Sequence, residues 1–188
     1  LFTGAGFVWY GGLIGGIVGV TLCIYRRGWS WIATMDAVAP SITLGHGIGR
    51  LGCHFAGDGD WGPPTTLPWG VAYPNAIVGW DYPPGVRVHP TPIYETTAYL
   101  LIFAFLWFRR SKPIQPGTQF GWYLILGSTA RFFLEFVRVN PPLLFVLSEA
   151  QVISILLVTA GLVLVFGRRE ASRETGTMTP PLVQEKQR

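Results

Sequence analysis

Residues 46–62 read HGIGRLGCHFAGDGDWG, and this stretch directly follows a long apolar run. It holds two His, one Cys, one Arg and two Asp among six Gly. Ionisable groups at the end of an apolar segment are costly in a membrane unless they face the interior of a helix bundle or meet a polar ligand. We therefore expect this stretch to end a membrane helix and to contribute to a functional site.

The whole chain has the composition of a membrane protein. Of its 188 residues, 49% are apolar and only 13% are charged, whereas a soluble domain has about 25% charged residues. Much of the net charge of +4 lies at the ends of apolar segments and near the C-terminus, which indicates membrane topology rather than nucleic-acid binding. The two cysteines make no disulfide framework, and Cys23 is expected to be a buried apolar residue.

Five apolar segments are candidates for crossing a membrane, which takes about 20 residues. The predicted spans are residues 6–25, 29–51, 93–108, 119–137 and 150–166. The second span contains Asp36 and Pro40, so we expect it to be interrupted and buried among the others. The predicted fold is therefore an all-α integral membrane protein.

Basic residues at alternate turns predict the orientation. They lie at 26–27, 109–112 and 168–169, and the positive-inside rule places all three groups in the cytoplasm. Residues 1–168 then form the membrane domain, with an outward-facing insert at 55–92, and residues 169–188 form a disordered cytoplasmic tail. The insert is rich in Pro, Gly and Trp, and its segment PWGVAYP, residues 68–74, is typical of a short β arm.

Polar clusters on the predicted helices are candidates for chemistry. His46 and Arg50 are four residues apart and share a helix face thinned by glycines. The alternative is a polar helix end from which Arg50 reaches the interface. WYGGLIGG, residues 9–16, is most simply explained by close helix packing. HPTPIYE, residues 89–95, is explained equally by a capped helix start with an interfacial tyrosine.

The segment STARFFLEFVR, residues 128–138, places Arg131, Glu135 and Arg138 along one helix stripe. A structural ion-pair network is one explanation. Together with Arg50, however, these arginines predict an excess of positive charge near the outer surface, which suits the phosphate of a phospholipid head group.

The order of these motifs resembles that of the prolipoprotein diacylglyceryl transferase family. The shared elements are GGLIG (11–15), DAVAP (36–40), GIGRLG (47–52), WG (61–62), PWG (68–70), HP with YE (89–90 and 94–95), and RF with Glu135 and Arg138 (131–138). Each motif is weak by itself, but their shared order is specific. The resemblance extends from about residue 7 to residue 138 and then over the last helix.

The resemblance implies a bundle of seven spanning helices in a bacterial cytoplasmic (inner) membrane, with the N-terminus outside. Five helices with matching end orientation would mean that two N-terminal helices lie before this chain. It also implies transfer of a diacylglyceryl group from phosphatidylglycerol to the thiol of a lipobox cysteine in a prolipoprotein signal peptide. No cofactor, metal or nucleic acid is expected.

The resemblance also implies roles for individual residues. Arg50 and Arg131 would hold the phosphate and its developing charge, Glu135 and Arg138 would orient Arg131 or the head group, and Tyr94 and Glu95 would shape the outer rim. The candidate catalytic residues are His46, Arg50, Arg131, Glu135, Tyr10 and His54. The candidate substrate-binding residues are Arg50, Gly52, Cys53, Asp58, Gly62, Tyr94, Glu95, Arg131 and Arg138.

Two departures from the family pattern affect this interpretation. Tyr10 replaces the histidine that is the usual candidate for activating the thiol, and Cys53 replaces an asparagine. We expect His46 or His54 to act as the base instead, because histidine titrates near neutral pH.

Three other functions stay open. The first is metal binding, by Cys53, His54, Asp58 and Asp60. These residue types bind metals, although their spacing matches no firm motif. Cys53 is also a candidate for a transient acyl or glyceryl carrier. Finally, loss of the family histidine is compatible with a non-catalytic protein that binds or transports anionic phospholipid.

Overall fold

The computed structural model describes residues 4–112, 115–138 and 147–167, apart from the side chains of residues 4–10 and 13. Within these ranges it contains the helices α1 (Gly4–Arg27), α2 (Trp31–Ala56), α3 (Thr91–Arg109), α4 (Thr118–Leu134) and α5 (Glu149–Leu162). A 3-10 turn, η1 (Glu135–Val137), continues α4, and a π-helical turn, η2 (Val163–Gly167), continues α5. The all-α prediction is confirmed. The predicted tail, residues 169–188, lies outside the described residues.

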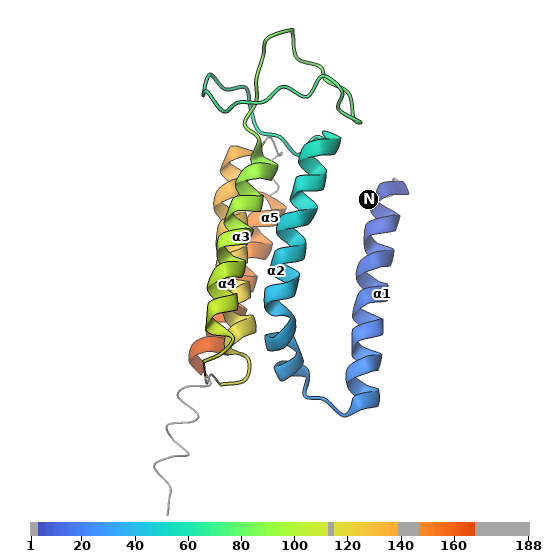
Figure 1. Ribbon diagram of the computed structural model, residues 1–188, viewed down its shortest axis with the longest axis vertical. Coiled ribbons are helices and arrows are strands. Elements are labelled where there is room, and N and C mark those ends of the chain that lie inside the picture. Colours follow the sequence, from blue (N-terminus) through green and yellow to red (C-terminus); the bar gives the residue numbers. More distant parts are fainter. Residues whose placement is uncertain (1–3, 113–114, 139–146, 168–188) are drawn as a thin grey trace, which may run out of the picture.

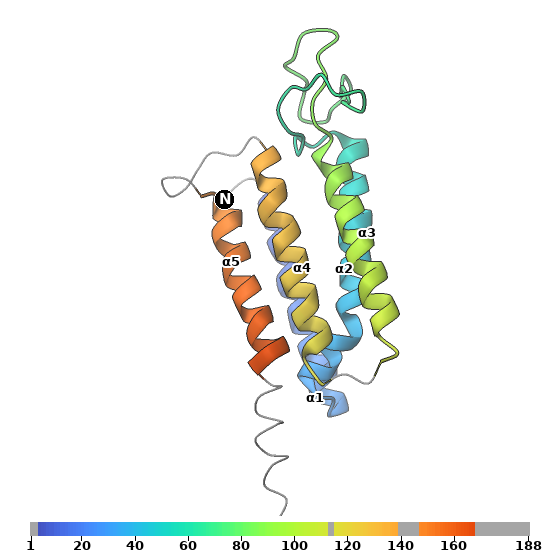
Figure 2. The same cartoon turned by 90° about the vertical axis from the view of Figure 1, so that its left-hand side faces the viewer.

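Helices α2 to α5 form the bundle, whereas α1 stands apart from it and is joined to α2 by a short loop (Figures 1 and 2). The buried centre contains Ala39, Tyr99, Ile102 and Leu106. Small residues allow close helix contact elsewhere, since a Cβ atom added at Gly161 of α5 would lie 2.7 Å from the carbonyl oxygen of Gly121 in α4.

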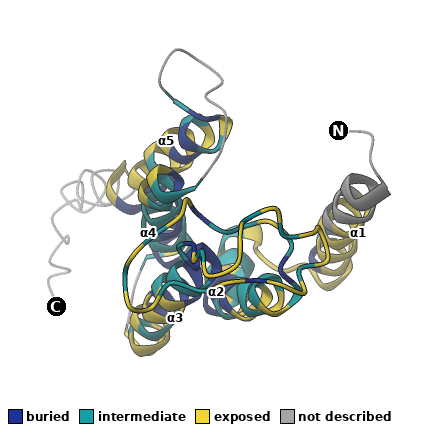
Figure 3. Ribbon diagram, turned by 90° about the horizontal axis from the view of Figure 1, so that it is seen from above, coloured by how far each residue is buried: buried dark blue, intermediate teal, exposed yellow. Residues whose placement is uncertain are grey.

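The bundle exposes large apolar side chains on its outer surface and also buries several polar ones. Leu156 and Val163 of the last helical segment are exposed, while Gln151 and Ser154 of the same helix are buried. Figure 3 shows the exposed outer faces of α1 and α5 seen from above. Two helical segments, Thr91–Arg109 and Glu149–Gly167, are long enough and apolar enough to cross a membrane. This apolar outer surface is suited to contact with lipid. Cys23 was predicted to be buried, but it is exposed on α1.

Helix α2 differs from its prediction in two ways. It runs without interruption through the buried Pro40 and continues past residue 51 as far as Ala56. Proline removes one backbone hydrogen-bond donor, a loss that neighbouring helices make tolerable inside a bundle. Gly57 then ends the helix with a φ of 64°, which favours glycine. As a result, Cys53 and His54 lie on the last helical turns rather than in a loop.

The insert between α2 and α3 lies over the ends of these two helices (Figure 1). Its described residues form no multi-residue strand. Two isolated bridges, Pro64 with Val88 and Val71 with Val88, are the extent of the β pairing there, so the predicted β arm remains unconfirmed. The C-terminal ends of α1 and α3, which carry basic residues, share the opposite end of the molecule (Figure 1).

Candidate functional site

The polar motifs meet at the end of the bundle beneath the insert. The last three turns of α2 supply His46 and Arg50, the second turn of α3 supplies Glu95, and the end of α4 supplies Arg131. Antiparallel helices bring the C-terminal ends of α2 and α4 to the N-terminal end of α3, although the motifs are far apart in the sequence.

Glu95 lies at the centre of a cluster of ion pairs. Its carboxylate is 2.7 Å from Nε of Arg50, 3.8 Å from Nε of Arg131 and 3.9 Å from Nη1 of Arg138. The side chain of Glu95 is only 1% exposed. The prediction that Glu95 shapes the outer rim is therefore wrong. A charged residue in a spanning helix must face the bundle interior, because lipid cannot solvate it.

Two further carboxylates complete the arginine cluster. Asp60 of the insert pairs with both Arg50 and Arg138. Glu135 pairs with Arg131 at 2.5 Å and lies 4.0 Å from Nε of Arg138. The described cluster thus holds three arginines and three carboxylates. The predicted excess of positive charge is not found, because carboxylates from α3 and the insert approach arginines that looked unpaired in the sequence.

A cavity of about 380 Å³ adjoins the cluster and is lined by residues of α2 to α5. Arg131 and His46 both line it, together with Tyr99, Tyr123 and Ser128. The His46 ring stacks on Tyr99, with a centroid separation of 3.9 Å and an angle of 14° between the ring planes. One cavity therefore contains an arginine able to bind an anion and an imidazole able to accept a proton.

His54 lies in a different environment. Its Nδ1 is 2.9 Å from the Tyr73 hydroxyl, and Tyr73 stacks on Trp61 with a centroid separation of 5.1 Å. Burial raises the pKa of Tyr73 to about 12. His54 is not among the residues that line the cavity beside Arg131.

Cys53, Asp58 and Asp60 have ligand atoms within 4.8 Å of one another, a spacing that a metal ion could bridge. His54 is not part of this group. The Sγ atom of Cys53 is also 3.9 Å from Nη1 of Arg50. Asp60 is bonded to two arginines, and their positive charges oppose a metal cation at the same carboxylate. The donor set therefore does not fit a resident metal.

Tyr94 joins the insert to α3. Its hydroxyl accepts a hydrogen bond from Trp69 Nε1 at 2.8 Å and lies 3.2 Å from His89 Nδ1. Tyr94 therefore lies where the insert meets the start of α3. Thr91, one turn earlier, donates its hydroxyl proton to the backbone carbonyl of Asp60 and so holds the loop that carries this carboxylate.

The two candidate glycines have different surroundings. Gly62 is buried, and an added Cβ atom would collide with the Val137 carbonyl oxygen and lie 3.0 Å from His89 Cβ. Gly52 is exposed, with nothing within 4 Å of such an atom. Close backbone approach explains glycine at position 62. Tyr10 lies in α1, and its side chain is outside the described residues.

Sequence reasoning missed Tyr99 and Tyr123, which line the cavity. Tyr99 follows Glu95 by four residues and therefore shares its helix face. This spacing could have predicted that Tyr99 faces the site. Asp60 was considered only as a metal ligand, and no local sequence pattern links it to Arg138.

Comparison with known proteins identifies the family of this chain. The sequence model described as prolipoprotein diacylglyceryl transferase matches residues 2–167. The chain belongs to the prolipoprotein diacylglyceryl transferase family.

Relatives from several bacteria are similar to this chain over most of its length. A phosphatidylglycerol–prolipoprotein diacylglyceryl transferase of Clostridium tetani is 37% identical over 85% of the chain and 63% of its own length. The phosphatidylglycerol–prolipoprotein diacylglyceryl transferase 2 of Clostridium perfringens is 34% identical over 92% of the chain and 67% of its own length. The corresponding transferase of Nitrosomonas europaea is 34% identical over 85% of the chain and 59% of its own length. The chain thus spans about three fifths to two thirds of these family members.

Proposed function

We propose that this chain transfers a diacylglyceryl group from phosphatidylglycerol to the thiol of a lipobox cysteine in a prolipoprotein. Family membership and the names of the relatives support this activity. The observation that carries the proposal is the arginine cluster beside a cavity that also contains an imidazole.

The reaction needs a group that stabilises the departing phosphate. The cysteine sulfur attacks the glyceryl carbon that bears the phosphate, a C–S bond forms, and the C–O bond breaks. Glycerol phosphate leaves with the bonding electron pair. Arg50 and Arg131 stabilise the charge that develops on the phosphate oxygens, and the surrounding apolar bundle strengthens this interaction.

A phosphate that enters the cluster competes with the carboxylates for the arginine donors, because each of the three arginines is already paired. Asp60 is the best candidate for displacement, since its side chain is 23% exposed, against 1% for Glu95 and 4% for Glu135. Asp60 also lies on the insert rather than on a packed helix. We infer that Asp60 occupies the phosphate position in the substrate-free protein, because its displacement would free donors of Arg50 and Arg138. Glu95 and Glu135 continue to orient Arg131, which approaches the phosphate from the cavity.

His46 is the stronger candidate for the base that takes the thiol proton. It lines the cavity with Arg131, whereas His54 is bonded to Tyr73 in the insert. The proposed substrate surface also includes Gly52, Cys53, Asp58 and, at its rim, Tyr94. Cys53 contacts the proposed phosphate-binding group Arg50, with its Sγ atom 3.9 Å from Nη1.

A lipid-binding protein without transferase activity is the second candidate. The balanced charge of the cluster favours it, because three carboxylates satisfy the arginines without any phosphate. In that case the arginines would have a structural role, and Tyr10 would mark the loss of the catalytic histidine.

The proposed setting is a bacterial inner membrane crossed several times, with seven helices in the whole protein and the insert facing outwards. The apolar outer surfaces of the bundle and the shared basic ends of α1 and α3 support this orientation. The partners would then be phosphatidylglycerol within the membrane and a prolipoprotein signal peptide at its outer face.

Complementation of a strain depleted of its own transferase tests the activity. The complete gene that encodes this chain is expressed as wild type, as His46→Ala and as His54→Ala. Rescue by the wild type and by His54→Ala, but not by His46→Ala, supports transferase activity with His46 as base. Rescue by all three rejects the assignment of His46. Failure of the wild type, with phosphatidylglycerol still bound to the purified protein, favours the lipid-binding function.

A further inference from the structure

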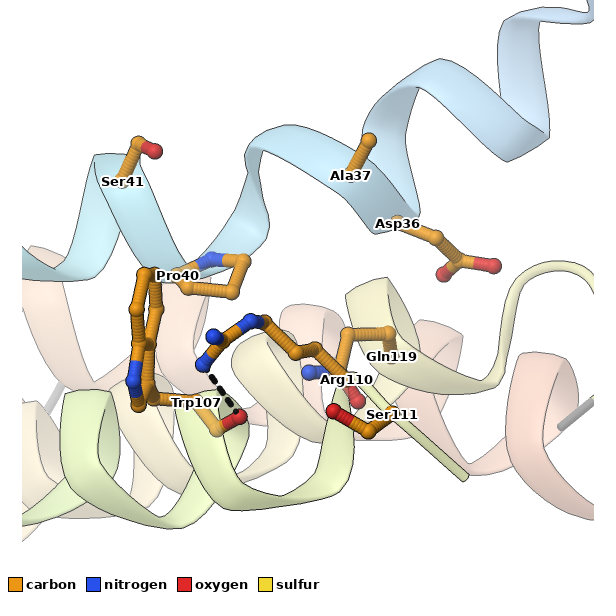
Figure 4. A pocket seen from close by; sticks show the side chains of 8 residues that line it. All are labelled: Asp36, Ala37, Pro40, Ser41, Trp107, Arg110, Ser111 and Gln119. Carbon is orange, nitrogen blue, oxygen red and sulfur yellow. Dashed lines mark hydrogen bonds between the residues drawn. The ribbon is translucent and has the colours of Figure 1, made fainter. Parts of the chain in front are cut away.

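A second polar cavity lies at the opposite end of the bundle from the arginine cluster. It has a volume of about 470 Å³ and is lined by residues of α2, the end of α3 and the start of α4 (Figure 4). This volume is within the range of about 300–1,000 Å³ that is usual for small-molecule sites. The lining includes Asp36, Trp107, Arg110, Ser111 and Gln119. The proposed transferase reaction uses none of these residues.

Gln119 gives this cavity an unused hydrogen-bond acceptor. The residue is 2% exposed, and its Nε2 donates to the Leu106 carbonyl oxygen at 2.5 Å. Its Oε1 has no hydrogen-bond partner among the described residues. A buried acceptor without a partner typically costs about 1–3 kcal/mol. Gln119 lines the cavity, so a ligand whose binding shifts the lining enough to donate a hydrogen bond to Oε1 would remove this cost.

Asp36 places a carboxylate on the same cavity. Its two oxygens accept hydrogen bonds from the backbone N–H groups of Gly117, at 2.6 Å, and Phe120, at 2.7 Å. These bonds hold the side chain against the first turn of α4. Each carboxylate oxygen has a further lone pair, so the fixed negative group still attracts a donor or a cation.

Arg110 places a guanidinium on the same cavity. Its Nη1 donates to the Trp107 carbonyl oxygen at 3.0 Å, and its central carbon lies 3.3 Å from the centroid of the Trp107 ring. This stacking fixes the position of the positive charge. Figure 4 shows Arg110 near Trp107 and Asp36 on a separate helix, so the two charges belong to different parts of the cavity.

We propose that this cavity binds a phospholipid head group in which a phosphodiester carries a primary ammonium, as in phosphatidylethanolamine. Arg110 and Ser111 bind the phosphate, while Asp36 and the Oε1 atom of Gln119 accept hydrogen bonds from the ammonium. The opposite charges of the lining match a zwitterion better than an anion. The end of the bundle that carries the basic residues of α1 and α3 faces the cytoplasm by the positive-inside rule, so the lipid comes from the inner leaflet.

Lipid binding to the purified full chain, measured by native mass spectrometry, tests the proposal. The probes are phosphatidylethanolamine, phosphatidylcholine and phosphatidylglycerol with identical acyl chains. Phosphatidylcholine is the matched probe because its quaternary ammonium has no N–H donor. We expect phosphatidylethanolamine to bind about tenfold more tightly than phosphatidylcholine, the usual effect of a charge-assisted hydrogen bond. We expect phosphatidylglycerol to bind the wild type no more tightly than phosphatidylethanolamine at the site that depends on Arg110.

Arg110→Gln should weaken phosphatidylethanolamine binding about tenfold. Arg26→Gln is the matched control. It removes the same charge from an exposed position on α1, at the same end of the molecule as Arg110. Gln119→Leu should reduce the preference for phosphatidylethanolamine over phosphatidylcholine. Since Gln119 also bonds to Leu106, the melting temperature of this variant is measured, and Ser111→Ala at the exposed edge serves as a second variant, with weaker binding expected.

Three results would overturn the proposal. These are equal binding of phosphatidylethanolamine and phosphatidylcholine, binding unchanged by Arg110→Gln, and a stronger Arg110-dependent preference for phosphatidylglycerol. Soluble glycerophosphoethanolamine distinguishes the source of the head group. Weak competition by this compound supports a membrane lipid, whereas competition at concentrations equal to those of the lipid would identify a soluble ligand instead.

Discussion

Replacing Glu95 by glutamine should destabilise the fold. The substitution keeps the shape of the side chain and removes the negative charge at the centre of the arginine cluster. The nearest contact, 2.7 Å to Arg50, corresponds to about 6 kcal/mol of Coulomb attraction at an effective dielectric constant of about 20. Desolvation offsets much of this attraction, but removing one partner of a buried pair still costs about 3–5 kcal/mol.

Thermal unfolding of the detergent-purified chain measures this effect. A chain of this size loses about 2–4 °C of melting temperature per kcal/mol, so Glu95→Gln should melt about 6 °C or more below the wild type. Glu149→Gln is the matched control, because Glu149 is exposed in the first turn of α5. If Glu95→Gln melts within about 2 °C of this control, the central position of Glu95 in the cluster is refuted.

Three further predictions concern the insert and its contacts. Gly62→Ala should cost about 1–3 kcal/mol by overpacking against Val137, whereas Gly52→Ala should be close to neutral; equal melting temperatures would contradict this. Asp60→Asn should lower the phosphatidylglycerol concentration needed for half-maximal binding, and weaker binding would show that Asp60 does not compete with phosphate. Because burial raises the pKa of Tyr73 to about 12, from about 10 in the unfolded chain, the unfolded state loses its proton first. The free energy of unfolding should therefore fall from pH 10 to pH 12, and it should fall less steeply in Tyr73→Phe. Equal pH dependence in the wild type and the variant would contradict the buried environment of the Tyr73 hydroxyl.

Much of the site could be predicted from residue types and short spacings. Arg131, Glu135 and Arg138 share a stripe because a helix repeats about every 3.6 residues, and a membrane forces such a stripe inward. His46 and Arg50 follow the same rule. The central position of Glu95 was not predicted, because one acidic residue at a helix start is equally compatible with an exposed rim.

The sequence alone determined the all-α class, the positions of the helices and the family. Apolar runs and local periodicity, which act over a few turns of one helix, set the class and the helix positions. The shared order of short motifs indicated the family. Tertiary structure decided the charge balance of residues 46–62. Arg50 looked unpaired until α3 brought Glu95 against it and the folded insert brought Asp60 to both Arg50 and Arg138. Pairing between residues so far apart depends on how antiparallel helices and the insert pack, which no local pattern encodes.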